Sequence, residues 1–318
     1  MRHLILLILG LVTTHLAQAT SVDAAAEGLG GATTANTGYL YHQANPAGLA
    51  MIGGNADIVA ILTSEYNTGN MFDVAAGRQV ALPRMPYALA AHVYQGFRED
   101  FFYNERLAAG QTFRVARTDT GVTVARIWRQ TPGGTHRLAV GLRPQLVSLK
   151  TDYTQTIYTA YSTQTIHTPY HAALFNFDLG LIHEFDYAWK WGLHLSDLLA
   201  KDVPFKGGTD TYQLRPQANL GVSWRGGRAL WTAALDLLAR PGYGPVAPQQ
   251  TLASGIEYRI VDEALLLRAG LSTSLRGSPV TCGHLGLGSH WAYVLVDVAY
   301  KSCTDDARGM AMNMGMRF

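Results

Sequence analysis

Charge is scarce in this sequence of 318 residues: Asp, Glu, Lys and Arg make up 15% of it, against about 25% in ordinary soluble domains. The 25 Lys and Arg barely exceed the 23 Asp and Glu, so the basic excess of nucleic-acid-binding proteins is missing. The hydrophobic share of 48% excludes a disordered chain, because disorder combines low hydrophobicity with high net charge. A soluble enzyme of this length normally carries more charge on its surface.

Long apolar runs are also lacking, with one exception at residues 4–12. This run follows Arg2 and His3 and precedes Ala17-Gln18-Ala19, which is the pattern of a cleavable secretory signal. No later stretch reaches the roughly 18 uncharged residues of a membrane-spanning helix. We therefore predict a signal peptide over residues 1–19, export from the cytoplasm and no helical membrane domain. A short buried helix is the alternative interpretation of residues 4–12.

From about residue 138 onward, apolar residues occupy every second position, which is the period of a strand with two different faces. In residues 212–224 one face is almost entirely apolar, and the other carries Gln, Arg, Asn, Gly and Ser. The same alternation marks residues 189–196, 252–261, 265–276 and 292–301. Two-faced segments of this kind predict an all-β chain.

The breaks between these segments are alternately short and long. We expect short turns at residues 131–136, 185–188, 225–228, 261–263 and 286–290, and long loops at residues 151–171, 199–210, 240–250 and 302–309. This arrangement is typical of a transmembrane antiparallel up-and-down β-barrel. A soluble β-sandwich would also alternate, but it would need charge on its outer face, which this chain lacks.

The end of the chain favours the barrel. Met314, Met316 and Phe318 alternate with small or polar residues, and the sequence stops on the Phe. Such a strand resembles the signal that the bacterial outer-membrane assembly machinery recognises. A soluble protein ending there would leave a row of methionines in an exposed terminal strand.

Counting backward from this strand predicts an even number of about 14 strands, as such barrels require. The predicted strands are residues 54–65, 88–98, 108–117, 121–131, 138–150, 172–184, 188–198, 211–223, 229–239, 251–261, 264–276, 280–287, 291–301 and 310–318. The barrel then covers residues 54–318, and residues 20–53 lie in the periplasm or inside the barrel. The part before residue 120 could be wrong by a pair of strands, because residues 98–110 fit neither strand nor loop well.

The two cysteines test this topology. Cys282 begins a descending strand and Cys303 follows the neighbouring ascending strand, so both fall at the extracellular rim. A disulfide between them would close a loop of about 20 residues, which is worth roughly 3 kcal/mol in the chain-entropy model. Export permits such a bond; two free thiols are the alternative.

Several segments carry a family resemblance. Residues 28–33 (GLGGAT) and 41–49 (YHQANPAGL) resemble the opening of the FadL-like outer-membrane barrels. Residues 142–146 (LRPQL) with 151–153 (TDY), 175–180 (FNFDLG) and 192–199 (GLHLSDLL) are most similar to the barrel family named after the conjugal-transfer protein TraF. That family usually has Asn where this chain has Asp197. The likeness covers most of the mature chain and is strongest over residues 138–240.

The resemblance implies that the N-terminal segment plugs the barrel, which makes residues 20–53 a plug. Its predicted ligand-contacting or plug residues are Gly28, Gly30, Gly31, Asn45 and Pro46. Glycine permits close backbone approach, and Asn45-Pro46 suits a fixed bend, because a residue before proline is driven toward extended conformations. An ordinary periplasmic leader is the alternative.

Pro144 and Pro216 each interrupt a strong strand pattern. Proline has no N–H to give to the sheet and is confined mostly to edges and bulges. A kink in the barrel wall at either residue would let an apolar ligand leave sideways into the membrane. A bulge without a transport role is the other interpretation.

The inward-facing positions carry charges of both signs, which predicts pairing across a mostly filled lumen rather than a selective ion ring. The lumen-lining residues are Arg143, Asp178, Lys190, His194, Arg215, Asp236 and Arg268, with Glu257, Arg259 and Asp297 on the same faces. No Walker loop, zinc-type Cys spacing or dinucleotide fingerprint occurs. We expect no catalytic residue, no metal and no cofactor.

The sequence therefore predicts a bacterial outer-membrane barrel that binds or transports hydrophobic small molecules. The alternative is a non-transporting subunit or scaffold of an envelope machine for conjugation or secretion, acting through its loops. The expected partners are outer-membrane lipid, the barrel assembly machinery, a hydrophobic ligand and an envelope protein, and no nucleic acid. A hydrolase at the barrel rim is a third and weaker hypothesis.

Overall fold

The structure is a computed structural model, and it describes residues 24–37, 44–51, 57–66, 71–81, 88–104, 109–158, 162–206, 210–242, 247–261, 264–276, 279–291, 294–305 and 308–317. The predicted signal peptide and Phe318 lie outside these residues. None of the helices in the described part is long and apolar enough to cross a membrane.

Fourteen antiparallel strands form a closed barrel, as predicted. In the order around the wall they are β1 (Asp57–Tyr66), β2 (Met71–Ala81), β3 (Ala88–Asn104), β4 (Ala109–Gln130), β5 (His136–Tyr158), β6 (Thr163–Phe185), β7 (Trp189–Ser196), β10 (Gln217–Gly226), β11 (Ala229–Asp236), β12 (Thr251–Val261), β13 (Leu265–Ser274), β14 (Thr281–Trp291), β15 (Val294–Cys303) and β16 (Arg308–Arg317). The last strand pairs with the first, from Asp57 opposite Arg317 to Tyr66 opposite Arg308. The terminal methionine strand therefore completes the wall.

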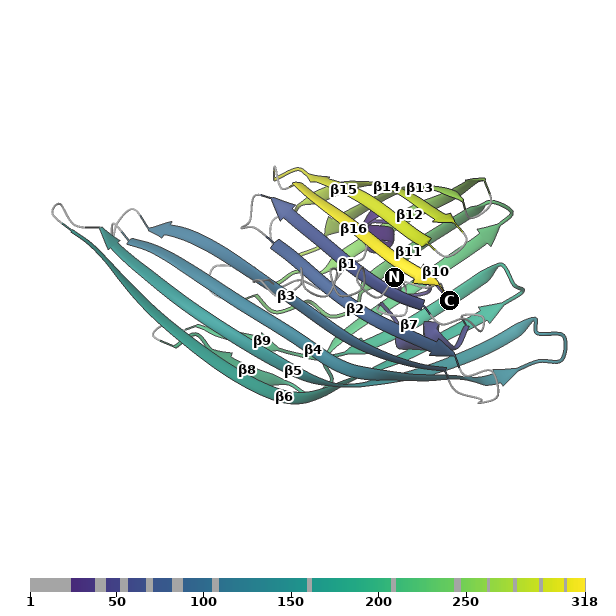
Figure 1. The fold of residues 1–318 in the computed structure, drawn as a ribbon, viewed down its shortest axis with the longest axis horizontal. Helices are drawn as coiled ribbons and strands as arrows, with labels where there is room; N and C mark the ends of the chain where they lie inside the picture. The colour runs from purple at the N-terminus through teal and green to yellow at the C-terminus, as the bar shows by residue number, and fades with distance from the viewer. Residues whose placement is uncertain are drawn as a thin grey trace, which may run out of the picture.

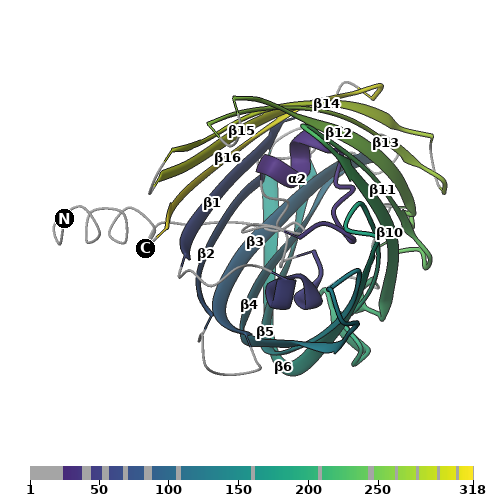
Figure 2. The same cartoon turned by 90° about the vertical axis from the view of Figure 1, so that its right-hand side faces the viewer.

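Two short helical segments lie inside the barrel: α2 (Ala24–Gly28) and the 3-10 helix η1 (Pro46–Met51). Figure 2 shows both, in purple, enclosed by the ring of strands. We call residues 24–37 and 44–51 together the plug.

The predicted count of strands is right, but two errors in it cancel. Residues 108–117 and 121–131, predicted as two strands, form the single strand β4 of 22 residues. Residues 71–81 were missed and form β2. Because one strand was added and one omitted, the directions from β5 onward are unchanged, whereas β3 runs opposite to its predicted direction.

The predicted turns and loops are partly wrong. Residues 286–290 belong to β14, and residues 151–171 are not a long loop, because β5 continues to Tyr158 and β6 begins at Thr163. The segment after β7 contains a hairpin of its own, β8 (Lys201–Pro204) and β9 (Thr211–Leu214), which pair with each other and not with the barrel wall.

The wall is much taller on one side. The strands β4, β5 and β6 have 22, 23 and 23 residues, whereas β10 to β16 have 8 to 11. A tilted strand crosses a bilayer in about 9–11 residues. Figure 1 shows β3–β6 projecting far beyond the other strands, with β8 and β9 beside them. We call this projecting part of β4–β6, with β8 and β9, the extension.

The boundary between membrane wall and extension is visible in β5. On the outer face, Leu142 and Leu146 are exposed, and the next outward positions are Ser148 and Lys150. On the inner face the order is reversed, because the buried polar Arg143 and Gln145 are followed by the buried apolar Val147 and Leu149. The apolar face therefore points to lipid below this level and into the molecule above it.

Tryptophan marks the opposite boundary. All six Trp residues lie within three residues of a strand end at the short-turn side of the barrel: Trp128, Trp189, Trp191, Trp224, Trp231 and Trp291. Aromatic girdles of this kind lie at the membrane–water interface of transmembrane barrels. The girdle and the change of faces in β5 together delimit the lipid-facing belt.

Candidate functional site: the plugged lumen

The plug contacts the wall at glycines. Seven wall glycines would each place an added Cβ atom 3.0 Å or less from a plug atom: Gly141, Gly180, Gly192, Gly221, Gly255, Gly270 and Gly286. Several are direct cross-strand partners, such as Gly141 with Gly180 and Gly255 with Gly270. Because glycine has no side chain, the plug backbone can lie directly on the wall.

Two of the three predicted plug glycines, Gly28 and Gly30, take part in this contact. A Cβ on Gly28 would lie 3.0 Å from the Cα of Gly286. Gly30 and Gly31 have φ angles of +68° and +84°, the left-handed region that favours glycine. Gly30 also lies against the Leu271 backbone of β13, whereas Gly31 has open space around its Cβ position.

Asn45 fixes the second half of the plug. It is fully buried, and its Nδ2 lies 2.9 Å from the carbonyl oxygen of Thr34, 3.2 Å from that of Leu181 and 3.3 Å from that of Leu193. Its Oδ1 accepts a hydrogen bond from the Ala47 backbone N–H, which begins η1 together with Pro46. One side chain thus joins the two parts of the plug to β6 and β7.

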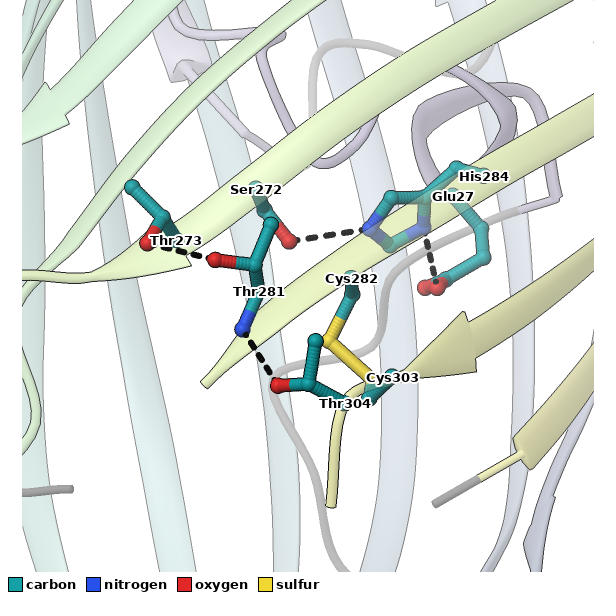
Figure 3. The surroundings of a disulfide bond; sticks show 8 residues. All are labelled: Glu27, Ser272, Thr273, Thr281, Cys282, His284, Cys303 and Thr304. Atoms are coloured by element: carbon teal, nitrogen blue, oxygen red, sulfur yellow. Dashed lines mark hydrogen bonds and ion pairs between the residues drawn. A yellow bond between two sulfur atoms is a disulfide. The ribbon is translucent and has the colours of Figure 1, made fainter. Parts of the chain in front are cut away.

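At the other end, α2 is held by a chain of three side chains (Figure 3). His284 Nδ1 lies 2.9 Å from Glu27 Oε1, and His284 Nε2 lies 2.9 Å from Ser272 Oγ. Although burial raises the pKa of Glu27, the hydrogen bond from His284 and the nearby positive charge of Lys301 outweigh it, and the pKa is lowered from its ordinary 4.5. Glu27 is therefore held as a carboxylate facing the wall.

The disulfide predicted between Cys282 and Cys303 is present, next to this chain (Figure 3). The two cysteines are direct cross-strand partners in β14 and β15, at the end of the barrel opposite the short turns. Cys282 lies two residues before His284 on the same face of β14. The bond therefore closes the rim beside the attachment point of α2.

Two buried ion networks lie in the lumen, the first on the short-turn side of the wall glycines that contact the plug and the second on the side of the extension. In the first, Arg268 contacts Glu257 at 3.0 Å and Asp297 at 2.6 Å, and His290 lies 3.3 Å from Asp297. In the second, Arg143 lies 3.4 Å from Asp178, and His194 lies 3.8 Å from the same carboxylate. Opposite charges are neutralised locally, which makes their burial tolerable.

The second network is larger than the sequence indicated. Arg117 donates two hydrogen bonds to Asp197, at 2.9 and 2.8 Å, and also contacts Asp119. Asp197 has a φ of 53°, a region that Asp and Asn tolerate better than most residues. Asn176 joins it to the strand β6. Asn176, Asp178 and Asp197 lie in the segments that carry the family resemblance. That resemblance is the feature of the sequence that could have indicated this network.

The other residues predicted to line the lumen lie outside these two networks. Lys190 contacts Glu184 at 3.1 Å and donates to Thr37 of the plug at 2.6 Å. Asp236 is buried at the loop end of β11, where it accepts from the Thr251 N–H. Arg215 is not brought together with the others, because it lies between β9 and β10 and pairs with the exposed Asp202 of β8.

An apolar cluster covers the inner face of the extension, directly above the second ion network. Its buried members are Phe113, Val115, Val147, Leu149, Tyr153, Val203 and Phe205. The rings of Tyr153 and Phe205 lie 5.3 and 5.2 Å from that of Phe113. Ala172, Leu174 and Tyr212 pack against it, so β4, β5, β6 and the β8–β9 hairpin all contribute.

The two prolines lie in different settings. At Pro144 the ladder to β6 is continuous, but the ladder to β4 is interrupted between Gly121–Gln145 and Val124–Leu142. The strands stay close there, because Gly121 lies against the Pro144 carbonyl and Arg143 Nε donates to Thr123 Oγ1 at 3.2 Å. Pro216 lies just before β10 and interrupts no ladder.

No constellation for metal binding occurs among the residues that the structure describes. Inside the barrel, His284 has both a hydroxyl and a carboxylate within hydrogen-bond distance, and these come from β13 and the plug. This row of three side chains could not be predicted, because Glu27, Ser272 and His284 are far apart in the sequence.

Comparison with known proteins identifies the fold. Residues 95–237 match the model of the family described as "F plasmid transfer operon, TraF, protein". No curated protein matches the sequence. The monoaromatic hydrocarbon channel CymD aligns with a TM-score of 0.62 and 11% identity, over 95% of this chain and 97% of its own.

Two further solved structures have the same architecture. A Pseudomonas aeruginosa FadL homologue aligns with a TM-score of 0.64 and 10% identity, over 96% of this chain and 99% of its own. The P. putida toluene transporter TodX aligns with a TM-score of 0.59 and 12% identity, over 95% and 98%. None of the three is an enzyme by its title. The chain has the fold of the FadL-like outer-membrane barrels, with a segment that matches the TraF family model.

Proposed function

We propose that this protein carries small hydrophobic molecules across the bacterial outer membrane. The observation that carries the proposal is the apolar cluster of the extension, which faces inward above the lipid-facing belt and collects aromatic and aliphatic side chains from four elements. The titles of two structures with the same fold, a monoaromatic hydrocarbon channel and a toluene transporter, agree with this ligand class.

The charges below the cluster suggest the direction in which such a ligand leaves. Arg143, Asp178 and Arg117 lie between the cluster and the plug, and an apolar molecule that displaced their partners would leave charges unpaired at high cost. The interruption of the ladder beside Pro144 lies at the same level, next to the exposed Leu142 and Val122. A sideways exit between β4 and β5, with separation of Arg143 from Thr123, is therefore the route we propose.

Uptake of radiolabelled toluene by cells that produce the protein tests this function. Cells with the wild-type protein should take up toluene several-fold faster than cells with an empty vector. Pro144→Val supplies the missing ladder N–H and should reduce the rate toward that of the empty vector, whereas Pro216→Val interrupts no ladder and should leave it unchanged. Equal uptake with and without the wild-type protein would contradict transport, and equal rates in the two variants would contradict the sideways route.

A second candidate function is a subunit of an envelope machine. The observation in its favour is that the TraF family match over residues 95–237 includes the whole extension and the β8–β9 hairpin. A protein of this kind would be required for conjugation or secretion without raising toluene uptake.

Membrane fractionation and the mass of the mature chain would test the predicted location and the cleavage after residue 19.

A further inference from the structure

In the described part of the extension, one edge of β6 has no neighbouring strand. The pairing of β6 with β5 runs along all 23 of its residues, whereas its pairing with β7 covers residues 179–185. The strand β7 ends at Ser196, and Asp197, with its positive φ, turns the chain out of the ladder. The described strands therefore leave residues 163–175 uncovered on this side, and we call these residues the free edge. Figure 1 shows β6 at the border of the projecting sheet.

Phe177, just beyond the free edge, shows where the backbone groups point. Its carbonyl accepts a hydrogen bond from the Leu198 N–H, and its N–H donates to Asn176 Oδ1 at 2.8 Å, so both groups point away from β5. These directions alternate from residue to residue along an antiparallel strand. The residues of the free edge that present both backbone groups in the same direction are Thr165, His167, His171, Ala173 and Phe175. Pro169 has this orientation too, but it presents only a carbonyl, because proline has no N–H.

The free edge has little of what usually protects an edge strand from pairing. Natural edge strands are short, or they carry charged side chains and prolines. Residues 163–175 include no Asp, Glu, Lys or Arg, and Pro169 removes a single donor. The outward-directed backbone groups of the free edge form no hydrogen bond with the backbone of another described segment. They are therefore available to a further strand.

The side chains beside this edge differ between its two faces. On the inner face, Ala172 and Leu174 pack against the apolar cluster, and Tyr170 and Ile166 follow it with 38% and 42% of their surface exposed. On the outer face, residues 163–171 carry exposed Thr, His and Pro side chains. A strand added here would continue the apolar cluster on one face and meet polar side chains on the other.

A second copy in the same membrane does not fit the free edge. Symmetric copies in one membrane are related by an axis along the membrane normal. The strands of transmembrane barrels tilt by about 35–45°, so two facing β6 edges would cross at about 70–90° and could not run side by side. The occupant is therefore a segment of a different protein, with an orientation of its own.

We propose that an extended segment of a partner protein at the cell surface binds the free edge as an added antiparallel strand. Hydrogen bonds between the two main chains hold the segment, and its alternate side chains select it. The side chains on its inner face are apolar, and those on its outer face are polar and uncharged. The inference holds for a channel and for a scaffold, because neither function is used in it.

The probe is a fluorescent peptide of about nine alternating threonine and valine residues, with a lysine at each end for solubility. The target is the full-length protein in uncharged detergent micelles, and fluorescence anisotropy reports binding. Opposed residues of an antiparallel pair lie on the same face, so the peptide threonines supply the N–H groups that bond residues such as His171 and Ala173. N-methylation of the threonines should abolish binding. N-methylation of the valines, which blocks only the far edge of the peptide, should leave it unchanged.

Two substitutions change the number of donors on the free edge in opposite directions. Pro169→Thr adds the missing N–H and should strengthen binding about fivefold, which corresponds to one hydrogen bond. His171→Pro removes an N–H and should weaken binding about fivefold; Pro169 shows that β6 accepts proline in this orientation. The matched control, His171→Ala, also loses the side-chain contact with Ser148 but keeps the backbone N–H, and it should bind as the wild type does.

Three results would overturn the proposal: no binding of the unmodified peptide, equal binding of the threonine-methylated peptide, or equal affinities of the three variants. A dimer that forms in lipid nanodiscs without peptide and is lost in His171→Pro would assign the free edge to a second copy, which also contradicts it. Heat-dependent migration on gels checks that each variant is a folded barrel before binding is measured.

Discussion

At the scale of single residues, the plug depends on a few polar contacts, and Asn45 makes the most of them. Asn45→Ala removes the amide that reaches the carbonyls of Thr34, Leu181 and Leu193. Leaving buried polar groups unpaired costs about 1–3 kcal/mol. We expect faster hydrogen exchange in the plug, measured by mass spectrometry.

Asn36 offers the control for this prediction. It is buried in the same plug, but among the residues that the structure describes its Nδ2 reaches the nearby carbonyl of Ala32, at 3.5 Å, and no wall strand. Asn36→Ala should therefore change exchange in the plug much less than Asn45→Ala. Similar effects of the two substitutions would mean that Asn45 does not fix the plug to the wall.

The attachment of α2 should depend on pH. The folded-state pKa of Glu27 is below its ordinary 4.5, so its contribution to plug stability is complete above that value and is lost as pH falls through the folded pKa. The protection factors of residues 24–31, which are exchange rates corrected for the intrinsic pH dependence of amide exchange, should fall below about pH 4.5 in the wild type. In Glu27→Gln this pH dependence should be absent, and an unchanged pH profile in the variant would contradict the assignment to Glu27.

At the scale of elements, the wall glycines are fitted to the plug. A Cβ on Gly180 would lie 2.7 Å from the Ala47 nitrogen and 2.8 Å from the Pro46 Cδ, so Gly180→Ala should push η1 away from the wall. Limited proteolysis within the plug should then become faster. Gly283→Ala is the matched control, because nothing lies within 4 Å of its Cβ position, and it should leave proteolysis unchanged.

The sequence predicted the elements wherever one face is apolar along the whole strand, as in β12 and β13. It failed at β4, because residues 118–121 (TDTG) have polar or small side chains on both faces and therefore resemble a turn. The structure explains them: Thr118 and Thr120 face outward at the upper boundary of the lipid-facing belt, and Asp119 pairs with Arg117 in the lumen. The missed strand β2 has Asp73, Ala75, Ala76, Gly77 and Arg78 in its middle. Small and charged residues therefore fall on both of its faces, and neither face is clearly apolar.

The site was predictable only in part for a related reason. The alternation of residues along a strand predicts that a charged side chain faces the lumen, but it does not predict its partner. Partners such as Arg268 and Asp297 come from different strands. The wall glycines could not be placed from the sequence, because their role depends on the backbone of a distant segment. The plug itself entered through the family resemblance and not through periodicity.

At the scale of the whole molecule, the barrel is a short cylinder with a tall wall on one side. Its lipid-facing belt is bounded by the tryptophan girdle at one end and by the change of faces in β5 at the other. Above the belt the same strands bury their apolar residues against the β8–β9 hairpin. One continuous sheet is therefore a membrane wall in its lower part and a soluble, half-covered sheet in its upper part.

This division predicts which positions of β5 water reaches in living cells. Lys150 and Leu142 are exposed and point to the same outer face of β5, but Lys150 lies above the change of faces and Leu142 below it. Lys150→Cys should react with a membrane-impermeant maleimide added to intact cells, and Leu142→Cys should not, because lipid covers it. Both native cysteines are in the disulfide and contribute no background. Labelling of Leu142→Cys in intact cells, or protection of Lys150→Cys, would place the membrane boundary elsewhere on the strand. The apolar cluster and the exit proposed at Pro144 would then not lie on the two sides of that boundary.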